Sequence, residues 1–292
     1  MSGPLVSIVT PSLQQGRFIE RTLESVAVQR DGSLADAIEH IVMDGGSTDG
    51  TLEILERWRD RIAFSSGPDG GQTAAINAGL ARARGDILAY LNADDLHYAG
   101  AIAAAVDAFE KDPQADVVYG DADLIDDDDR LIGSYPTEAW SMERLKLICF
   151  LCQPAVFFRR RVIEQFGPFD ERLDLCMDYE YWLRLGLRGA RFVRIPAKLA
   201  AARHHADAKT FRLRRQAHTE INDMLKQRLG TVPDNWLSNH AVAVLDGRRV
   251  RRDGGFVYVV RVVMLTIIAA LRWRRFPSLS LLRNAAWSAR HA

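Results

Sequence analysis

Short apolar runs alternate with helical patterns over the first two thirds of the chain. The apolar runs have the length and composition of buried strands and lie at 5–9, 38–43, 86–91 and 115–120. Between them, apolar residues recur at helical spacing at 17–29, 51–59, 72–83 and 98–110. This alternation predicts an α/β fold, with a mainly parallel sheet flanked by helices. Because the carboxyl ends of parallel strands meet at one edge of a sheet, we expect ligand-binding side chains to gather there.

The second apolar run ends in an acidic residue followed by two glycines, in the stretch IVMDGGSTDGT at 41–51. The glycines permit a sharp turn, and Asp44 would lie at the sheet edge. A carboxylate there is well placed to accept hydrogen bonds from a nucleotide base or ribose. A capped strand-to-helix turn without a ligand explains the same residues equally well. The dinucleotide fingerprint G-x-G-x-x-G is absent, which disfavours a nicotinamide or flavin site.

Two adjacent carboxylates follow the third apolar run, in DILAYLNADDL at 86–96. Asp94 and Asp95 would repel each other at a strand end unless a cation lay between them. Hard oxygen ligands suit Mg²⁺ or Mn²⁺, which bind through one or two carboxylates together with substrate phosphates. The alternative is a helix start at which Asp95 favours the helix dipole.

A third acidic pair lies in LDLCMDYEYWLRL at 173–185, where aromatic and apolar residues recur at helical spacing. Asp178, near the start of this helix, is a candidate general base for a sugar hydroxyl. Glu180 would point to a different face. In the alternative interpretation, Asp178 only caps the helix and Glu180 pairs with an arginine such as Arg184.

Two histidines and an arginine occur together in AAARHHADAKT at 200–210. Arg203, His204 and His205 are candidates for contact with a metal or a diphosphate. Taken alone the signal is weak, because histidines of this kind are more often exposed loop residues. The acidic run at 126–129 is expected to form a solvated hairpin turn after a short strand.

Six segments occur in one order and together resemble the family 2 glycosyltransferases. They are VSIVTPS at 6–12, IEHIVMDGGSTDGTLEIL at 38–55, SSGPDGGQTAAINAGLARARGDILAYLNADD at 65–95, QPAVFFRR at 153–160, FGPFDERL at 166–173 and MDYEYWLRL at 177–185. The resemblance covers roughly residues 5–210. It implies a Rossmann-like GT-A fold, a nucleotide-diphospho-sugar donor, a divalent metal (Mg²⁺ or Mn²⁺) and inversion at the anomeric carbon by a single displacement.

The resemblance also implies roles for individual residues in binding the nucleotide. Pro11 and Ser12 would line the nucleotide pocket, Asp44 would bind the base, and Asp69 would contact the nucleoside. The family often has Tyr-Asn after Pro-Ser, where the aromatic ring can stack on the base. Leu13 and Gln14 stand at those positions here, so base stacking is not expected from the sequence.

The remaining roles implied by the resemblance concern the reaction. Asp94 would match the ribose-side carboxylate of the metal motif, and Asp95 the main metal ligand. His205 resembles the late histidine near the metal and diphosphate. Asp178 resembles the catalytic base, although Met177 stands before it where the family often has Glu. A metal would neutralise the leaving diphosphate, so one carboxylate suffices to deprotonate the acceptor.

The charge of the chain is divided between its two ends. The 292 residues carry no net charge, but residues 203–292 hold 17 Lys and Arg against 6 Asp and Glu, a net charge of +11. Residues 1–202 carry the opposite charge. We therefore expect two domains, a nucleotide-sugar glycosyltransferase domain at 1–210 and a basic, helical extension at 211–292.

An apolar segment at 256–271 lies in the basic extension, with arginines on both sides. Its sixteen residues fall short of the roughly 20 that span a bilayer. The pattern predicts peripheral contact with an anionic membrane through 248–276, with a buried helix, a dimer contact or a true span as alternatives. The apolar run makes nucleic acid an unlikely partner of this region. With few cysteines and no N-terminal signal pattern, we expect a cytoplasmic location, at the cytoplasmic face of the inner membrane.

These patterns together predict an inverting, metal-dependent glycosyltransferase. Its acceptor would be a saccharide or a lipid-linked molecule, and its product a cell-surface polysaccharide or glycolipid. The alternative is a catalytically silent nucleotide-binding or scaffold protein of the same fold. Nucleotidyl transfer is less favoured, because the segment at 6–18 offers one glycine and one arginine where a triphosphate-binding loop would be expected.

Overall fold

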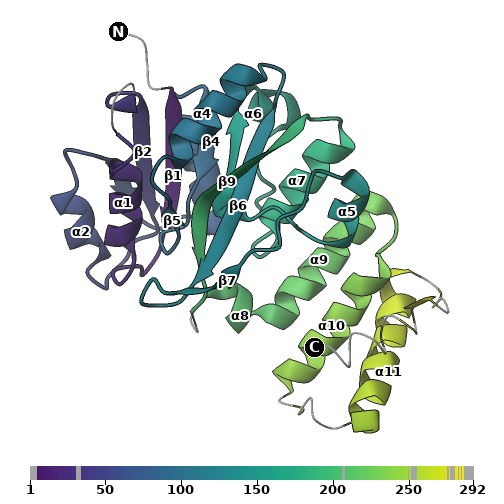
Figure 1. Ribbon diagram of the computed structural model, residues 1–292. Helices are drawn as coiled ribbons and strands as arrows, with labels where there is room; N and C mark the ends of the chain where they lie inside the picture. Colours follow the sequence, from purple (N-terminus) through teal and green to yellow (C-terminus); the bar gives the residue numbers. More distant parts are fainter. Residues whose placement is uncertain are drawn as a thin grey trace. The chain divides into compact units, whose positions relative to one another are not determined.

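The computed structural model of the chain describes residues 5–30, 34–205, 208–248, 250, 255–274, 276, 280, 281, 283 and 285. The chain divides into two compact units (Figure 1). The first comprises residues 1–145 and 149–205, and the second comprises 146–148 and 206–292. The predicted domains at 1–210 and 211–292 stay a prediction.

The first unit is built on a mixed sheet. Its strands are β1 (Val6–Ser12), β2 (Ile38–Asp44), β3 (Ala63–Ser66), β4 (Ile87–Tyr90), β5 (Leu96–His97), β6 (Val117–Ile125), β7 (Leu131–Ser134), β8 (Val156–Arg159) and β9 (Phe192–Arg203). The strand order in the described residues is β3-β2-β1-β4-β8-β6-β9-β5, and β7 pairs with β6. The block β3-β2-β1-β4 is parallel, and β6 is parallel to β9. Strand β8 runs antiparallel to both of its neighbours, β4 and β6.

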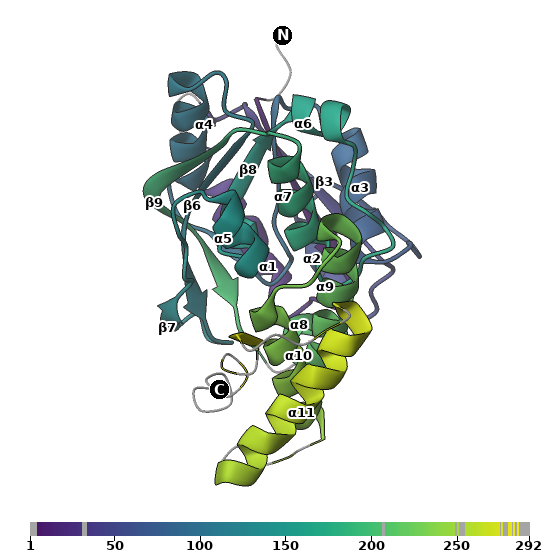
Figure 2. The same cartoon turned by 90° about the vertical axis from the view of Figure 1, so that its right-hand side faces the viewer.

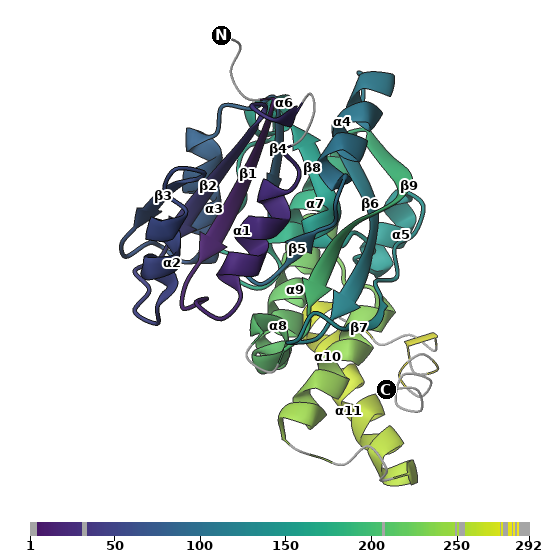
Figure 3. The same ribbon diagram turned by 60° about the vertical axis from the view of Figure 1, so that its left-hand side comes forward.

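Helices cover both faces of this sheet. They are α1 (Ile19–Ala27), α2 (Thr51–Arg57), α3 (Gln72–Arg82), α4 (Ala101–Lys111), α5 (Met142–Leu147), the 3₁₀ turn η2 (Gln153–Ala155), α6 (Arg160–Phe166) and α7 (Met177–Leu187). Helices α1 and α4 lie on one face and α3 on the other (Figure 3). Apolar residues of β1, β4, β6 and α4 make up the largest part of one core cluster.

Close packing of α3 on the sheet depends on one glycine. A Cβ atom at Gly79 would lie 2.4 Å from Cγ1 of Val9 on β1, and 3.1 Å from Cγ of Met43 on β2. Real side chains do not approach so closely, so α3 can lie against these strands only without a side chain at this position. The first turn of α3 is thereby held near the carboxyl ends of β1 and β2.

The elements predicted from the sequence are confirmed with small shifts at their ends, and the α/β fold with helices on both faces is confirmed. The sheet is less parallel than expected. Strand β8 follows η2 and enters the sheet between β4 and β6 in the opposite direction. The acidic run at 126–129 forms the connection between the antiparallel strands β6 and β7, as predicted.

The described part of the second unit is helical, as predicted for the extension. Its helices are α8 (Lys209–Arg212), α9 (Arg214–Leu229), α10 (Asp234–Gly247) and α11 (Gly255–Trp273) (Figure 2). Helices α10 and α11 share a small apolar core that includes Leu245 and Val262. Helix α11 is long and apolar enough to cross a membrane, as judged by length and composition alone, and 28% of its most apolar window is buried.

Candidate active site

The carboxyl ends of the parallel strands place the predicted nucleotide-binding residues at one edge. Pro11 and Ser12 end β1, and Asp44 ends β2. In the register of the sheet Ser12 lies opposite Asp44, and Asp44 lies opposite Ser66 at the end of β3. Ligands bind at this edge of open α/β sheets, so the sequence prediction of where these side chains gather is confirmed.

The carboxylate of Asp44 is buried, and both of its oxygens accept hydrogen bonds from neighbouring residues. Its Oδ2 accepts hydrogen bonds from the backbone N–H of Gly46 (3.0 Å) and Ser47 (2.9 Å) and from the hydroxyl of Ser66 (2.6 Å). The Ser47 hydroxyl donates to Oδ1 over 2.5 Å. Asp44 thus fixes the turn that follows β2, in which Gly46 has a φ of +88°. Contact with a nucleotide base stays a prediction.

A buried hydroxyl without a partner lies beside this turn. Ser12 is 5% exposed, and its Oγ makes no hydrogen bond to the described residues. Buried polar groups are almost always paired, so this hydroxyl is a candidate contact for a ligand. The carboxylate of Asp69 lies nearby. Its Oδ1 accepts from Gly71 N–H over 2.8 Å, and its Oδ2 is 3.2 Å from the position of a Cβ on Gly45.

The loop after β1 is joined to the loop after β2 by hydrogen bonds. The N–H of Gln14 donates to the Ser47 hydroxyl over 2.8 Å, and the Gln14 side chain exchanges two 3.1 Å bonds with Thr48. Gln14 has a φ of +55°, and Gly16 N–H donates to Asp49 over 2.9 Å. Leu13, in the place where the family often has an aromatic residue, is exposed above this rigid loop.

Asp94 and Asp95 follow β4 and have different surroundings. Oδ2 of Asp94 lies 3.0 Å from Nε2 of His205, although 111 residues separate the two in the chain. Asp95 is buried. Its Oδ1 accepts the N–H of Arg203 over 2.8 Å, and its Oδ2 accepts the amide of Asn92 over 3.1 Å. Burial, and then the charge of Asp94, raise the pKa of Asp95 well above its usual range.

The guanidinium of Arg203 holds this corner together. It is buried, and its Nε donates to the backbone oxygen of Asp94 over 2.8 Å. Its other nitrogens donate to the backbone oxygen of Asp126 over 2.6 Å and pair with the carboxylate of Asp129. It also lies 4.8 Å from the ring centroid of Phe18. The sequence left Arg203 open as a diphosphate contact, whereas the structure uses its donors to fasten the β6–β7 connection.

A chain of side-chain amides supports Asn92 from the other direction. Gln72 donates to Oδ1 of Asn92 over 2.9 Å, and Asn92 donates to Oε1 of Gln153 over 3.2 Å. Gln153 in turn donates to the backbone oxygen of Tyr90 over 2.7 Å. Sequence reasoning gave Gln72 and Gln153 no role. Their position as the first residues of α3 and η2, inside segments shared with the family, was the available signal.

Asp178 lies in the first turn of α7 and is half-buried. Its Oδ1 accepts the N–H of Tyr179 over 2.8 Å. Burial, then the charge of Asp178 and then that of Asp95, raise the pKa of Tyr90 well above its usual range. A carboxylate in this position has the chemistry of a general base.

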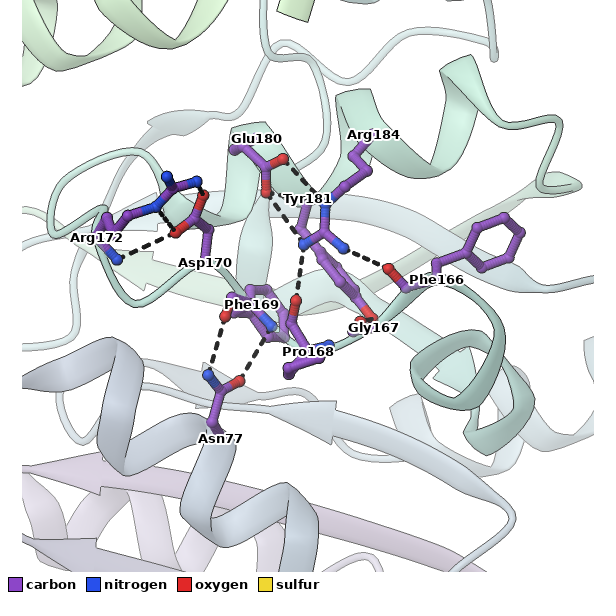
Figure 4. A network of polar contacts seen from close by, with 10 residues as sticks. All are labelled: Asn77, Phe166, Gly167, Pro168, Phe169, Asp170, Arg172, Glu180, Tyr181 and Arg184. Carbon is purple, nitrogen blue, oxygen red and sulfur yellow. Dashed lines mark hydrogen bonds and ion pairs between the residues drawn. The ribbon is translucent and has the colours of Figure 1, made fainter. Parts of the chain in front are cut away.

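Glu180 differs from Asp178 in having no exposed surface. Its Oε1 lies 3.0 Å from Nε of Arg184, one helical turn further along α7. Arg184 also donates to the backbone oxygens of Phe166 (2.6 Å) and Pro168 (2.7 Å), as Figure 4 shows. Glu180 is thus part of a buried ion pair that joins α7 to the end of α6, which was one of the alternatives from the sequence.

Two residues of α3 position the segment that leads into α7. Asn77 donates to the backbone oxygen of Phe169 over 2.9 Å and accepts the N–H of Phe169 over 3.1 Å (Figure 4). The Thr73 hydroxyl donates to the backbone oxygen of Leu173 over 2.7 Å. Sequence reasoning did not identify Asn77 or Thr73. They tie the start of α7, and with it Asp178, to the helix that also supports Asn92.

A metal at this corner would need ligands besides the side chains that the described residues bring together there. Among the residues that the structure describes, no three His, Cys, Asp or Glu side chains lie close enough to hold a metal ion by themselves. The Asp94 carboxylate and the His205 imidazole form a pair of oxygen and nitrogen donors beside the buried Asp95. A pair of this kind fits a divalent ion that takes its other ligands from substrate phosphates and water.

The model of the family described as glycosyl transferase family 2 matches residues 7–167. This span includes β1, β2, β4 and the segments that hold Ser12, Asp44 and Asp94. The chain belongs to glycosyl transferase family 2. The resemblance seen in the sequence is thereby confirmed, and the chain is a glycosyltransferase by family.

Relatives and solved structures agree with this assignment. A PGL/p-HBAD biosynthesis glycosyltransferase of Mycobacterium tuberculosis is 32% identical over 190 residues, which cover 63% of this chain and 70% of the relative. In structure the glycosyltransferase resembles TarS 1–349 of S. aureus in complex with UDP-GlcNAc (TM-score 0.63, 17% identity, 98% of this chain and 91% of that chain). It also resembles the mannosyltransferase PcManGT of Pyrobaculum calidifontis in complex with GDP-Man and Mn²⁺ (TM-score 0.57, 16% identity, 99% and 86%).

Proposed function

We propose that this glycosyltransferase moves a sugar from a nucleoside-diphosphate donor to an acceptor hydroxyl, with inversion and with the help of a divalent cation. The observation that carries the proposal is the pair formed by Asp94 and His205. Their side chains meet 3.0 Å apart at the end of β4, next to the buried carboxylate of Asp95. The carboxylates of Asp94 and Asp95 repel each other, so this corner favours the binding of a cation. A bound cation in turn favours the binding of the donor's diphosphate.

The nucleoside would bind at the ends of β1 and β2. The unpaired hydroxyl of Ser12 is available to it, and the Asp44 turn provides a rigid wall. Asp69, whose carboxylate lies against Gly45, is the proposed contact to the nucleoside. Because Leu13 is aliphatic, we expect it to contact the base through its methyl groups, in place of the stacking that an aromatic ring provides.

Asp94 and His205 would hold the cation directly. Both oxygens of Asp95 already accept hydrogen bonds from Arg203 and Asn92, so Asp95 would contribute a remaining lone pair and its charge. A bound cation would neutralise the negative charge that develops on the leaving diphosphate.

Asp178 would take the proton of the acceptor hydroxyl. In the proposed single displacement, the acceptor oxygen forms a bond to the anomeric carbon while the bond to the diphosphate oxygen breaks, and the proton passes to the carboxylate of Asp178. Inversion needs no second catalytic carboxylate. The nearest alternative, Glu180, has its charge paired with Arg184 and no exposed surface.

The relatives support a donor and an acceptor class. Three of the structural neighbours are complexes, with UDP, UDP-GlcNAc and GDP-Man, and the one with GDP-Man also holds Mn²⁺. The mycobacterial relatives carry names from PGL/p-HBAD biosynthesis. We propose a saccharide or lipid-linked acceptor and a role in the biosynthesis of a cell-surface glycolipid or polysaccharide.

The experiment is a donor screen on the purified chain. Release of nucleoside diphosphate is measured with UDP-, GDP-, dTDP- and CDP-sugars, with Mn²⁺, with Mg²⁺ and with EDTA, and proton NMR gives the anomeric configuration of any product. We expect turnover of one donor class, dependence on the cation, inversion, and loss of transfer in Asp178→Asn. Asp107→Asn, an exposed carboxylate on α4, is the matched control. Binding of a nucleotide without any turnover would instead favour the silent protein of the same fold.

A further inference from the structure

Helix α11 has two apolar faces, and in the part of the chain that the structure describes only one of them is covered. Tyr258, Val262, Thr266 and Trp273 are buried on the face that packs against the neighbouring helices. The other face carries an exposed stripe at helical spacing, formed by Val257, Val260, Met264, Ile268 and Leu271. Phe256 and Phe276 extend the stripe at its two ends, and both are largely exposed. Soluble proteins rarely leave so long an apolar stripe facing water.

The covered face also bonds α11 to charged side chains of α9 and α10. The indole N–H of Trp273 donates to Asp223 of α9 over 2.7 Å, and Arg274 forms an ion pair with Asp234 of α10. Helix α9 is polar, with Asp223 half-exposed at 56% of its side chain. Because Asp223 and Asp234 are bonded to this part of the chain, α11 could enter a bilayer core only together with them. Charged side chains are costly in a bilayer core, so α11 does not enter it.

Basic residues flank the stripe in the sequence. The sequence from 248 to 276 contains eight arginines and one acidic residue. Arg261 and Arg272 are exposed on α11 itself, at one edge of the stripe. In the same unit, a hollow of about 540 Å³ is lined by Arg212, Arg214, Arg215 and Arg248, with Asp246 as the one acidic residue among its lining.

We propose that the stripe of α11 (Val257, Val260, Met264, Ile268 and Leu271) docks on the surface of an anionic phospholipid bilayer, with α11 lying in the plane of the interface. Apolar side chains would enter the boundary of headgroups and acyl chains, and the arginines at the edge would pair with lipid phosphates. A second copy of the chain fits less well, because two stripes face to face would bring two sets of arginines together.

The test is flotation of the full chain with phospholipid vesicles. Vesicles of phosphatidylcholine alone are compared with vesicles that contain about one third phosphatidylglycerol, at low and at high NaCl. One variant combines Val260→Gln, Met264→Gln and Ile268→Gln, and a second combines Arg261→Gln and Arg272→Gln. The matched control combines Leu131→Gln and Ile132→Gln, two exposed apolar residues of β7. Circular dichroism of each variant checks the fold, and light scattering gives its oligomeric state.

We expect the chain to float with the anionic vesicles, and to do so less at high salt. The stripe variant should lose about tenfold or more in vesicle affinity, the arginine variant should lose its preference for anionic lipid, and the control should bind as the unchanged chain does. Absence of flotation with anionic vesicles would overturn the proposal. A dimer that the stripe variant dissociates would assign the stripe to a second copy instead. Resistance of cell-membrane-bound protein to alkaline carbonate extraction would indicate a spanning helix.

Discussion

The two acidic corners of the site are built in different ways. Around Asp44 the partners lie within three residues or on the adjoining strand, and four donors satisfy the carboxylate. Around Asp94 and Asp95 one partner, Asn92, is local, and the others named above come from more than 100 residues away, on β9 and just beyond it. The Asp44 corner is complete without a ligand, whereas the Asp94 carboxylate faces an imidazole beside a second carboxylate. In the proposed function, the first corner supplies rigidity and the second supplies the chemistry.

The largest effect is expected from Asp94→Asn. Removing this charge should lower the rate of sugar transfer by about 10²–10³-fold, because the developing charge on the diphosphate loses its stabilisation. The free energy of unfolding should change by less than about 0.5 kcal/mol, since the side chain is partly exposed and accepts few bonds. Turnover assays and urea unfolding measure the two quantities. An equal loss of rate in the control Asp107→Asn would show that the effect is not specific to the carboxylate of Asp94.

Arg203→Met tests the corner at Asp94 and Asp95, which depends on contacts between residues far apart in the chain. This change leaves Asp129 and two backbone oxygens without their buried donor, so we expect a loss of about 3 kcal/mol in the free energy of unfolding. Arg130→Met, which removes an exposed partner of Asp128, should change stability by less than about 1 kcal/mol. Urea unfolding measures both variants. Equal stabilities would show that the corner does not depend on Arg203.

Asp44→Asn tests the local corner. Two backbone N–H groups and two hydroxyls donate to the Asp44 carboxylate. In the variant the N–H₂ of the amide is itself a donor, so it would face some of these donors without an acceptor. We expect a loss of about 2 kcal/mol in the free energy of unfolding. Asp69→Asn removes an exposed carboxylate that accepts the backbone N–H of Gly71, and it should change stability by less than about 1 kcal/mol. If the two variants unfold alike, the Asp44 turn is not the rigid wall described above.

The last effect concerns His40 of β2 and is seen as a dependence of stability on pH. Burial, above all, lowers the pKa of His40 to about 3, and its Nε2 lies 2.9 Å from the Thr10 hydroxyl. The unfolded chain takes up a proton near pH 6.5 and the folded chain does not, so stability falls as the pH drops from about 6.5 toward 3.

The variant His40→Gln should reduce the slope of that fall by up to about 1.4 kcal/mol per pH unit. Urea unfolding at several pH values between 4 and 7 gives the slope for both proteins. The other buried histidines retain their share, so the slope should diminish and not vanish. An unchanged slope would mean that His40 is protonated in the folded state.

The sequence predicts the local contacts around Asp44 better than the long-range contacts around Asp95. The strand that ends at Asp44 and the glycine turn after it are local patterns, and both were found at the predicted place. The partners of Asp95 were out of reach, because the contact of Arg203 with it depends on how β9 packs beside β5 and β6. Likewise, no local pattern shows that Asn77 holds both backbone groups of Phe169.

The most direct test of the central claim is a titration of the purified chain with Mn²⁺, followed by electron paramagnetic resonance, with and without the nucleoside diphosphate chosen by the donor screen. The account predicts that the nucleotide tightens Mn²⁺ binding, and that Asp94→Asn and His205→Gln both abolish this tightening while Asp107→Asn leaves it intact. Mn²⁺ binding that is equally tight in Asp94→Asn would contradict the account, because the cation would then be held elsewhere.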